Sequence, residues 1–150
     1  MADTPFTFRL VTPQRLLLEA EVTSLQVPGS EGYLGVLAHH APLITALRPG
    51  RLDVRDAKGA MQSYAVSGGF LEVSGNRATV LADTAERKDE IDIARAEACV
   101  KRAEERLRAD SGSGMGMGGG TTAATATAID KERAQRALER AKNRLHVARG

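Results

Sequence analysis

The sequence predicts an all-β sandwich or barrel at the N-terminus, followed by an antiparallel hairpin of two α-helices. Two observations support this division. All five aromatic residues lie before residue 86, among short segments of alternating apolar and polar residues. After it, a similar 17-residue helical pattern occurs twice, at 91–107 and 129–145. We therefore expect a β domain over residues 1–85 and a helix–loop–helix region over residues 86–150.

The first part carries the alternation of half-buried β-strands. In FTFRLVT, Phe6, Phe8 and Leu10 alternate with polar residues. RLDVRDAKGAMQSYAV predicts a hairpin that turns between Asp56 and Gly59, and FLEVSGNRATVLA predicts another that turns at SGNR. Turn residues recur at roughly 8–12-residue spacing, which is typical of a compact sandwich or barrel.

The β part shows no catalytic or metal-binding pattern. Ser67-Gly68-Gly69 lacks the G-x-S-x-G frame of a hydrolase nucleophile. His39 and His40 are adjacent, so on a strand they would point to opposite faces and would not share one metal ion. We expect a non-catalytic protein without a metal site or a required cofactor.

The two helical segments carry narrow apolar stripes that are largely alanine. The stripes are Ala96, Val100, Ala103 and Leu107 in the first segment, and Ala134, Leu138, Ala141, Leu145 and Ala148 in the second. This spacing predicts an antiparallel pair, and its small side chains predict a contact weak enough to separate. Between the helices we expect a flexible glycine-rich insert at about 110–126, with Thr127 to Asp130 as the capping frame of the second helix.

Arginine residues recur on one face of each helix. They are Arg95, Arg102 and Arg106 in the first copy, and Arg133, Arg140 and Arg144 in the second. If the helices fold back on each other, Asp92 and Arg95 face Arg140 and Arg144. Clustered guanidinium groups suit phosphate oxygens. A solvated or protein-binding face explains the same charges, and Asp92 fits an acid in the first turn of a helix.

Three segments in order carry a resemblance to a known family. They are GSEGYLGVLAHHAPLITALRPG (29–50), YAVSGGFLEV (64–73) and VLADTAERKDEIDIARA (80–96). They closely resemble the epsilon subunit of F-type ATP synthases, over nearly the whole chain except the glycine-rich insert. The resemblance implies a non-catalytic rotor subunit of the central stalk that couples rotation to catalysis. It also implies C-terminal helices that inhibit ATP hydrolysis when they extend.

The resemblance also implies contact residues in the β domain. The segment that matches the loop touching the c ring comprises Ser30, Glu31 and Gly32, and the positions that match the side associated with gamma are His40 and Thr45. Relatives often carry Pro-Gly where this chain has Ala38-His39, so the turn at this point is expected to differ.

Some bacterial relatives bind ATP at the folded hairpin through an Ile/Leu-Asp-x-x-Arg-Ala motif. The matching residues here are Ile91, Asp92, Arg95 and Ala96, with Arg102, Arg140 and Arg144 as supporting arginines and Glu86 as a weaker member. The resemblance therefore implies a regulatory ATP that favours the folded hairpin.

The implied partners are the gamma subunit, the c ring and the alpha/beta catalytic head. The implied location is peripheral, on the cytoplasmic side of a bacterial inner membrane, since no apolar run approaches the length of a membrane span. Two alternatives remain open: a β-domain scaffold with a coiled-coil arm, and a basic hairpin that binds nucleic acid. Eleven interspersed acids and the absence of aromatic residues after residue 85 argue against nucleic acid.

Overall fold

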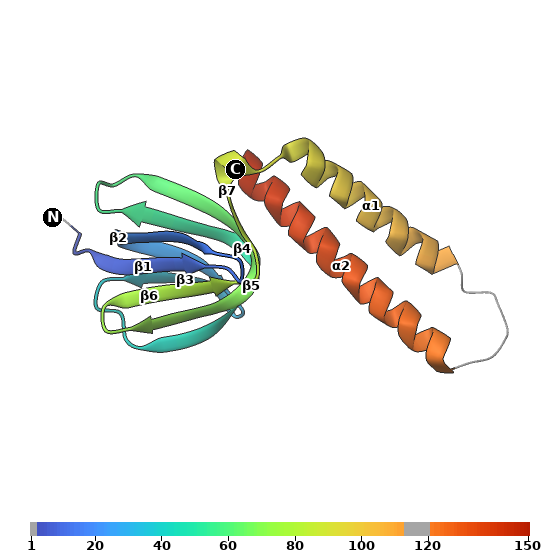
Figure 1. Ribbon diagram of the computed structural model, residues 1–150, viewed down its shortest axis with the longest axis horizontal. Coiled ribbons are helices and arrows are strands. Elements are labelled where there is room, and N and C mark those ends of the chain that lie inside the picture. Colours follow the sequence, from blue (N-terminus) through green and yellow to red (C-terminus); the bar gives the residue numbers. More distant parts are fainter. Residues whose placement is uncertain (1–2, 113–120) are drawn as a thin grey trace. The chain divides into compact units, whose positions relative to one another are not determined.

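A computed structural model describes residues 3–112 and 121–150 of the chain (Figure 1). The chain forms two compact units, one ending at Ile91 and one spanning Asp92–Arg149. The first unit is built of strands and the second of helices, as the sequence predicted. The boundary lies six residues after residue 85, because a short last strand and a 3-10 turn belong to the first unit.

In the described residues, the first unit contains seven strands. They are β1 (Phe6–Val11), β2 (Leu16–Gly29), β3 (Gly32–Leu37), β4 (Leu43–Asp56), β5 (Met61–Ser74), β6 (Arg77–Ala82) and β7 (Ala85–Arg87). The 3-10 turn η1 (Lys88–Glu90) follows β7. Both predicted hairpins are confirmed, since β4 pairs with β5 and β5 pairs with β6 in antiparallel register.

Five strands close into a barrel. Their order is β1-β6-β5-β4-β2, and β2 pairs with β1 to complete the ring. The β1–β6 pair is parallel, whereas the other pairs are antiparallel. β3 pairs with β2 outside the ring, and β7 pairs with β5. Because the ring is closed, each of its five strands has a neighbouring strand to pair with on both sides.

The barrel core is formed by the inward-facing residues of these strands. Phe6, Phe8 and Leu10 are buried, as the alternation in FTFRLVT predicted. Other large side chains of this unit that are fully buried are Val22, Val27, Val36, Leu52, Val54, Val66, Leu71 and Val80. At about 25 cal/mol per Å² of buried apolar surface, these side chains provide most of the hydrophobic stabilisation of the unit.

In the middle of strand β5, the residues that face the core change from the even-numbered positions to the odd-numbered positions. Tyr64 and Val66 point inward before this point, and Leu71 and Val73 point inward after it. The change occurs at Gly68 and Gly69, whose φ angles of 97° and 122° are accessible mainly to glycine. A β-carbon at Gly69 would lie 2.0 Å from the carbonyl oxygen of Leu81. The two glycines thereby turn Phe70 to the outside of the barrel.

The two adjacent histidines lie in the turn after β3 and not on a strand. His39 has a φ of 60°, which is the left-handed conformation that glycine adopts most readily. Its backbone N–H donates to Oδ1 of Asn76 at 2.9 Å. His39 thus adopts a backbone conformation that glycine would adopt without strain.

The second unit is an antiparallel pair of helices, α1 (Ile93–Gly112) and α2 (Thr121–Arg149). Both helices extend into the segment expected to be a loop, which spans about 110–126. The start expected for α2 at Thr127 to Asp130 is wrong, since α2 begins at Thr121. The alanine and threonine run over 121–128 continues the helix, because alanine has the highest helix propensity. The centre of the expected insert, residues 113–120, lies outside the described residues.

Both alanine stripes lie in the contact between the helices. Ala96 and Ala103 of α1 and Ala134 and Ala141 of α2 are buried. The larger members of the stripes are only half-buried, and these are Val100, Leu107, Leu138 and Leu145. The alanine-rich seam is therefore confirmed.

Candidate functional site

The motif expected to bind nucleotide is divided between the two units. Glu86 is half-buried on β7, opposite Ala65 of β5, and Ile91 is buried at the end of the first unit. The remaining members lie on the two helices and are Asp92, Arg95, Ala96, Arg102, Arg140 and Arg144.

Asp92 is the N-cap of α1. Its Oδ1 atom accepts a hydrogen bond from the backbone N–H of Arg95 at 3.0 Å, and its carbonyl oxygen accepts one from the N–H of Ala96 at 3.0 Å. The sequence placed Asp92 inside the first turn, but the helix begins one residue after it. An aspartate at this position satisfies a backbone donor that the helix leaves unpaired.

Two ion pairs between the helices show the register of the hairpin. Oε1 of Glu104 lies 3.9 Å from Nζ of Lys142, and the carboxylate of Glu97 pairs with the guanidinium group of Arg149. Both pairs give the same antiparallel register, because moving seven residues forward along α1, from Glu97 to Glu104, corresponds to moving seven residues back along α2, from Arg149 to Lys142. In this register Arg102 is level with Arg144, and Arg106 is level with Arg140.

We call the arginine-rich side of the hairpin the arginine flank, and it comprises Arg95, Arg102, Arg106, Arg140 and Arg144. The two interhelical ion pairs lie on the opposite side of the alanine seam, because Glu97 and Glu104 directly follow the seam residues Ala96 and Ala103. Arg95, Arg102 and Arg106 are exposed, as is Arg140, whereas Arg144 is half-buried. The guanidinium group of Arg102 donates to Sγ of Cys99 at 3.2 Å.

The register corrects one expectation. Asp92 and Arg95 were expected to face Arg140 and Arg144 directly. Instead, at 1.5 Å of rise per residue, Arg95 lies about 10 Å along α1 from the level of Arg144 and about 16 Å from the level of Arg140. The arginines that the structure brings level are Arg102 with Arg144, and Arg106 with Arg140. Arg106 was not among the expected site residues, although it was noted on the same face.

The segment expected to touch the c ring forms the tight turn between β2 and β3. Ser30 and Glu31 are exposed, and the N–H of Ser30 donates to the carbonyl oxygen of Ala46 at 2.9 Å. A β-carbon at Gly29 would lie 2.8 Å from the carbonyl oxygen of Gly32, so the turn requires glycine. The turn thus presents one hydroxyl group and one carboxylate to solvent at the end of the sheet.

The two residues expected to contact gamma are less exposed than their neighbours. A ring nitrogen of His40 lies 2.7 Å from the carbonyl oxygen of Ala41, and the ring is half-buried. Thr45 is also half-buried, because it lies on the same face of β4 as the buried Leu47. The adjacent Ile44 lies on the other face and is 74% exposed. Sequence reasoning therefore missed the most exposed apolar residue of this strand.

A row of apolar residues crosses the outside of the barrel. Strand pairing places Ala46 opposite Phe70, Phe70 opposite Leu81, Leu81 opposite Val11, and Val11 opposite Leu16. We call these five residues the apolar row. Phe70 is 56% exposed and Leu81 is 49% exposed. Contiguous apolar surface of this kind marks interaction sites in soluble proteins. The parity change at Gly68-Gly69 is the sequence signal that points to it.

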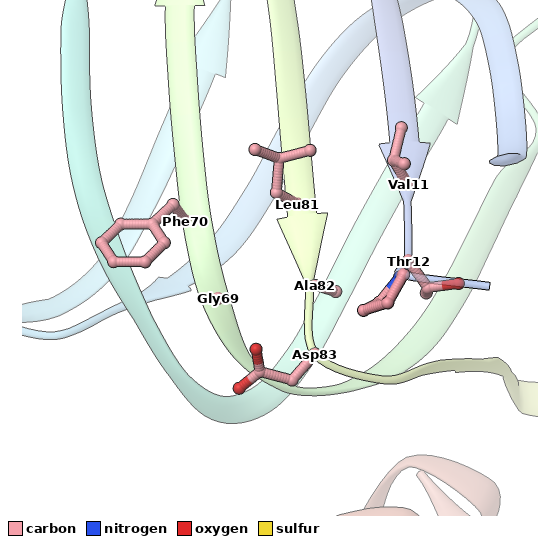
Figure 2. A pocket seen from close by; sticks show the side chains of 8 residues that line it. Val11, Thr12, Gly69, Phe70, Leu81, Ala82 and Asp83 are labelled. Atoms are coloured by element: carbon pink, nitrogen blue, oxygen red, sulfur yellow. The ribbon is translucent and has the colours of Figure 1, made fainter. Parts of the chain in front are cut away.

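A shallow pocket of about 310 Å³ lies on the apolar row. Figure 2 shows Phe70 and Leu81 projecting from neighbouring strands, with Val11 and Thr12 on the next strand. The carboxylate of Asp83 is the one charged group in its lining. The pocket therefore combines an apolar floor with a single negative charge at its edge.

Just before the motif, Arg87 and Asp89 form a bidentate ion pair on the surface. The hydrogen bonds that Arg87 donates to Asp89 raise the pKa of Arg87 and lower the pKa of Asp89. Both groups stay charged at neutral pH, so the pair is structural and supplies no acid–base chemistry. Among the described residues, no helix is long and apolar enough to cross a membrane.

Comparisons with known proteins match both units. Residues 5–88 match the β-sandwich domain of the ATP synthase delta/epsilon chain, and residues 89–149 match the long α-helix domain of the same chain. An ATP synthase epsilon chain from Desulforamulus reducens is 42% identical over 139 residues, which cover 93% of each chain. One from Desulfitobacterium hafniense is 40% identical and covers 99% of each chain.

A solved structure has the same fold. It is a chain of the Euglena gracilis mitochondrial ATP synthase, with a TM-score of 0.73 and 24% identity, matched over 97% of this chain and 82% of that one. The fold, both domain matches and the full-length relatives agree. The chain therefore belongs to the ATP synthase delta/epsilon family, as an epsilon subunit of an F-type ATP synthase.

Proposed function

We propose that the helical hairpin regulates ATP hydrolysis by the complex and binds ATP in its folded form. The observation that carries this proposal is the arginine flank, where Arg102 is level with Arg144 and Arg106 with Arg140. Guanidinium groups match the oxygen geometry of phosphates, so groups at one level on two helices can bind one polyphosphate. A triphosphate would bridge the two helices in this way.

In this proposal ATP acts as a regulatory ligand and not as a substrate. Arg102 and Arg144 would contact the phosphates, and Arg95 would reach them from the first turn of α1. A ligand shifts a conformational equilibrium only by its differential affinity for the two forms. Because the level pairs exist only when the helices are together, ATP would favour the folded hairpin. Low ATP would release the helices towards the alpha/beta catalytic head, where they inhibit hydrolysis.

A titration of the full chain with ATP, followed by backbone NMR, tests the nucleotide site. We expect shifts at Arg102, Arg144, Asp92 and Arg95 at millimolar ATP, and weaker shifts in Arg102→Gln. Arg108→Gln is the matched control, because it removes the same charge from the same helix but lies beyond the arginine flank. An unperturbed spectrum at millimolar ATP would refute nucleotide binding without affecting membership of the rotor.

We further propose that the apolar row is the surface that binds the gamma subunit, with Ile44, His40 and Thr45 at its margin. The exposed side chains of Phe70 and Leu81 support this, since aromatic and aliphatic residues dominate the cores of protein interfaces. The edge charge of Asp83 favours a basic residue on the partner beside an apolar anchor. Ser30, Glu31 and Gly32 would contact the c ring at the end of the sheet.

Co-purification with gamma tests the docking surface. Phe70→Ala removes an exposed anchor and is expected to weaken binding at least tenfold, as hot-spot residues do. Met61→Ala is the matched control, because Met61 is similarly exposed but lies outside the apolar row. Equal effects of the two substitutions would exclude the apolar row as the gamma-binding surface.

Catalysis would belong to other subunits of the complex, since no nucleophile or acid–base pair was found in the sequence. The protein would be peripheral, held on the cytoplasmic side of a bacterial inner membrane through gamma and the c ring. Membrane fractionation with and without gamma tests this location, because loss of gamma is expected to release the chain into the soluble fraction.

A further inference from the structure

The two ion pairs between α1 and α2 occupy equivalent positions along the hairpin. Glu97 and Glu104 are seven residues apart on α1, and their partners Arg149 and Lys142 are seven residues apart on α2. Seven residues make about two helical turns, so both pairs lie on one side of the hairpin. We call this side the paired flank.

Each charged residue of the paired flank directly follows a residue of the alanine seam. Ala96 precedes Glu97, and Ala103 precedes Glu104. On α2, Ala141 precedes Lys142, and Ala148 precedes Arg149. In coiled coils, the positions that border the seam determine partner choice and orientation through their charges. At these four positions α1 supplies two acids and α2 supplies two bases.

The paired flank does not continue along the whole hairpin. One heptad before Lys142, α2 carries the neutral Gln135 at the equivalent position. Along α2, both of these ion pairs therefore lie in the C-terminal half of the helix. The opposite side of the seam is the arginine flank, where like charges are level.

We propose that Glu97–Arg149 and Glu104–Lys142 form an electrostatic clasp that sets the register of the hairpin and holds the end of α2 against α1. The alanine seam supplies little register information, because sliding one helix by a heptad again places small residues opposite small residues. The clasp supplies it, since a slide by one heptad leaves an acid without its base.

The expected free energy of the two ion pairs is small enough for the hairpin to open and close reversibly. An exposed ion pair changes an equilibrium by at most about fivefold, and replacing one partner with a like charge changes it further. The closed population of the hairpin is thus sensitive to these four side chains without being locked by them. The clasp stands independently of nucleotide binding.

Spin-label distances in the full chain test the clasp. Ala98 and Gln135 are exposed and neutral, so cysteine-attached labels at these positions report whether the helices are together, in a Cys99→Ser background. Glu104→Lys is expected to lower the ratio of short to long distances by about threefold to tenfold. Glu105→Lys is the matched control, because it makes the same charge change at the next residue, outside the paired flank, and should leave the ratio within about twofold.

The reversed pair distinguishes the clasp from a general charge effect. Glu104→Lys combined with Lys142→Glu is expected to restore the wild-type ratio, and raising the salt concentration to about 1 M should reduce the difference between wild type and Glu104→Lys. Equal effects of Glu104→Lys and Glu105→Lys would overturn the proposal. Failure of the charge swap to restore the short distance, or one short distance in every variant, would overturn it as well.

Discussion

At the scale of single residues, two positions have nearly the same left-handed backbone conformation but differ in their side-chain contacts. His39 has a φ of 60° and Asn76 a φ of 56°. The side chain of His39 is exposed, and no hydrogen bond to it was found in the described residues. The side chain of Asn76 accepts from the N–H of His39 and donates to the carbonyl oxygen of Pro5 at 3.4 Å. Asn76 therefore offsets its backbone strain with contacts, and His39 does not.

His39→Gly is accordingly expected to stabilise the protein by about 0.5–1 kcal/mol, because relief of left-handed strain exceeds the added entropy of the unfolded chain. Asn76→Gly relieves the same strain but removes two hydrogen bonds, so it is expected to destabilise by about 1 kcal/mol. Urea denaturation followed by circular dichroism measures both. Similar free-energy changes for the two variants would contradict this account.

Tyr64 gives a prediction for alkaline pH. Burial raises the pKa of its phenol, and the charge of Arg87 acts in the opposite direction. Because the folded pKa is raised, the stability from the neutral phenol is fully present below the unfolded pKa of about 10 and is lost as the pH rises through the folded pKa. In a Tyr33→Phe background, phenolate absorbance should titrate above the ordinary value. Arg87→Gln should move the titration higher still, and an unshifted midpoint would argue against a buried phenol.

At the scale of elements, strand patterns were predictable but strand lengths were not. FTFRLVT and both hairpin turns are read from local alternation, which holds because each strand has one face in the core. The passage from Val66 to Leu71 breaks that alternation at Gly68-Gly69, so local reasoning divides one strand of 14 residues into two. Phe70 was missed as a surface residue for the same reason.

The helices show the same limit. The seam was predictable because its heptad spacing is local, whereas the register was not, because alanine opposes alanine equally well after a slide. The expected meeting of Arg95 with Arg140 and Arg144 depended on register and was wrong by about one heptad or more. The residues that fix register, Glu97 and Glu104 with their partners, carry no individual signal in the sequence.

The two copies of Ile-Asp provide an element-scale prediction. Asp92 caps α1, whereas Asp130 lies within α2, which begins at Thr121. Asp92→Ala is expected to destabilise α1 by about 1 kcal/mol, and Asp92→Asn should retain the cap. Asp130→Ala should instead stabilise α2 by about 0.5 kcal/mol, because alanine is the better helix former.

Hydrogen exchange along each helix measures these changes. Asp92→Asn also separates two roles of one residue, since it keeps the cap while removing the negative charge. If Asp92→Asn leaves α1 intact but alters the ATP titration, Asp92 contributes to nucleotide binding beyond its capping role. If both aspartates respond alike to alanine, the assignment of Asp92 as the cap is contradicted.

At the scale of the whole molecule, the two units differ in how they obtain stability. Every residue of the main hydrophobic cluster lies between Phe6 and Ala82, within the barrel. The helical unit buries chiefly alanines in its seam, and helices in proteins gain most of their stability from packing an apolar face. The barrel should therefore fold cooperatively by itself, whereas the hairpin by itself should be only weakly stable.

A chain ended after Ile91 tests this asymmetry. It retains all seven strands, η1 and the boundary residue, so we expect a cooperative thermal transition within about 5 °C of the β-unit transition in the full chain. The fragment 92–150 should show partial helicity that fades gradually on heating, without a cooperative step. Circular dichroism distinguishes the two behaviours. An unfolded 1–91 fragment would mean that the hairpin contributes to barrel stability, and regulation by release of the helices would then carry a cost to the rotor itself.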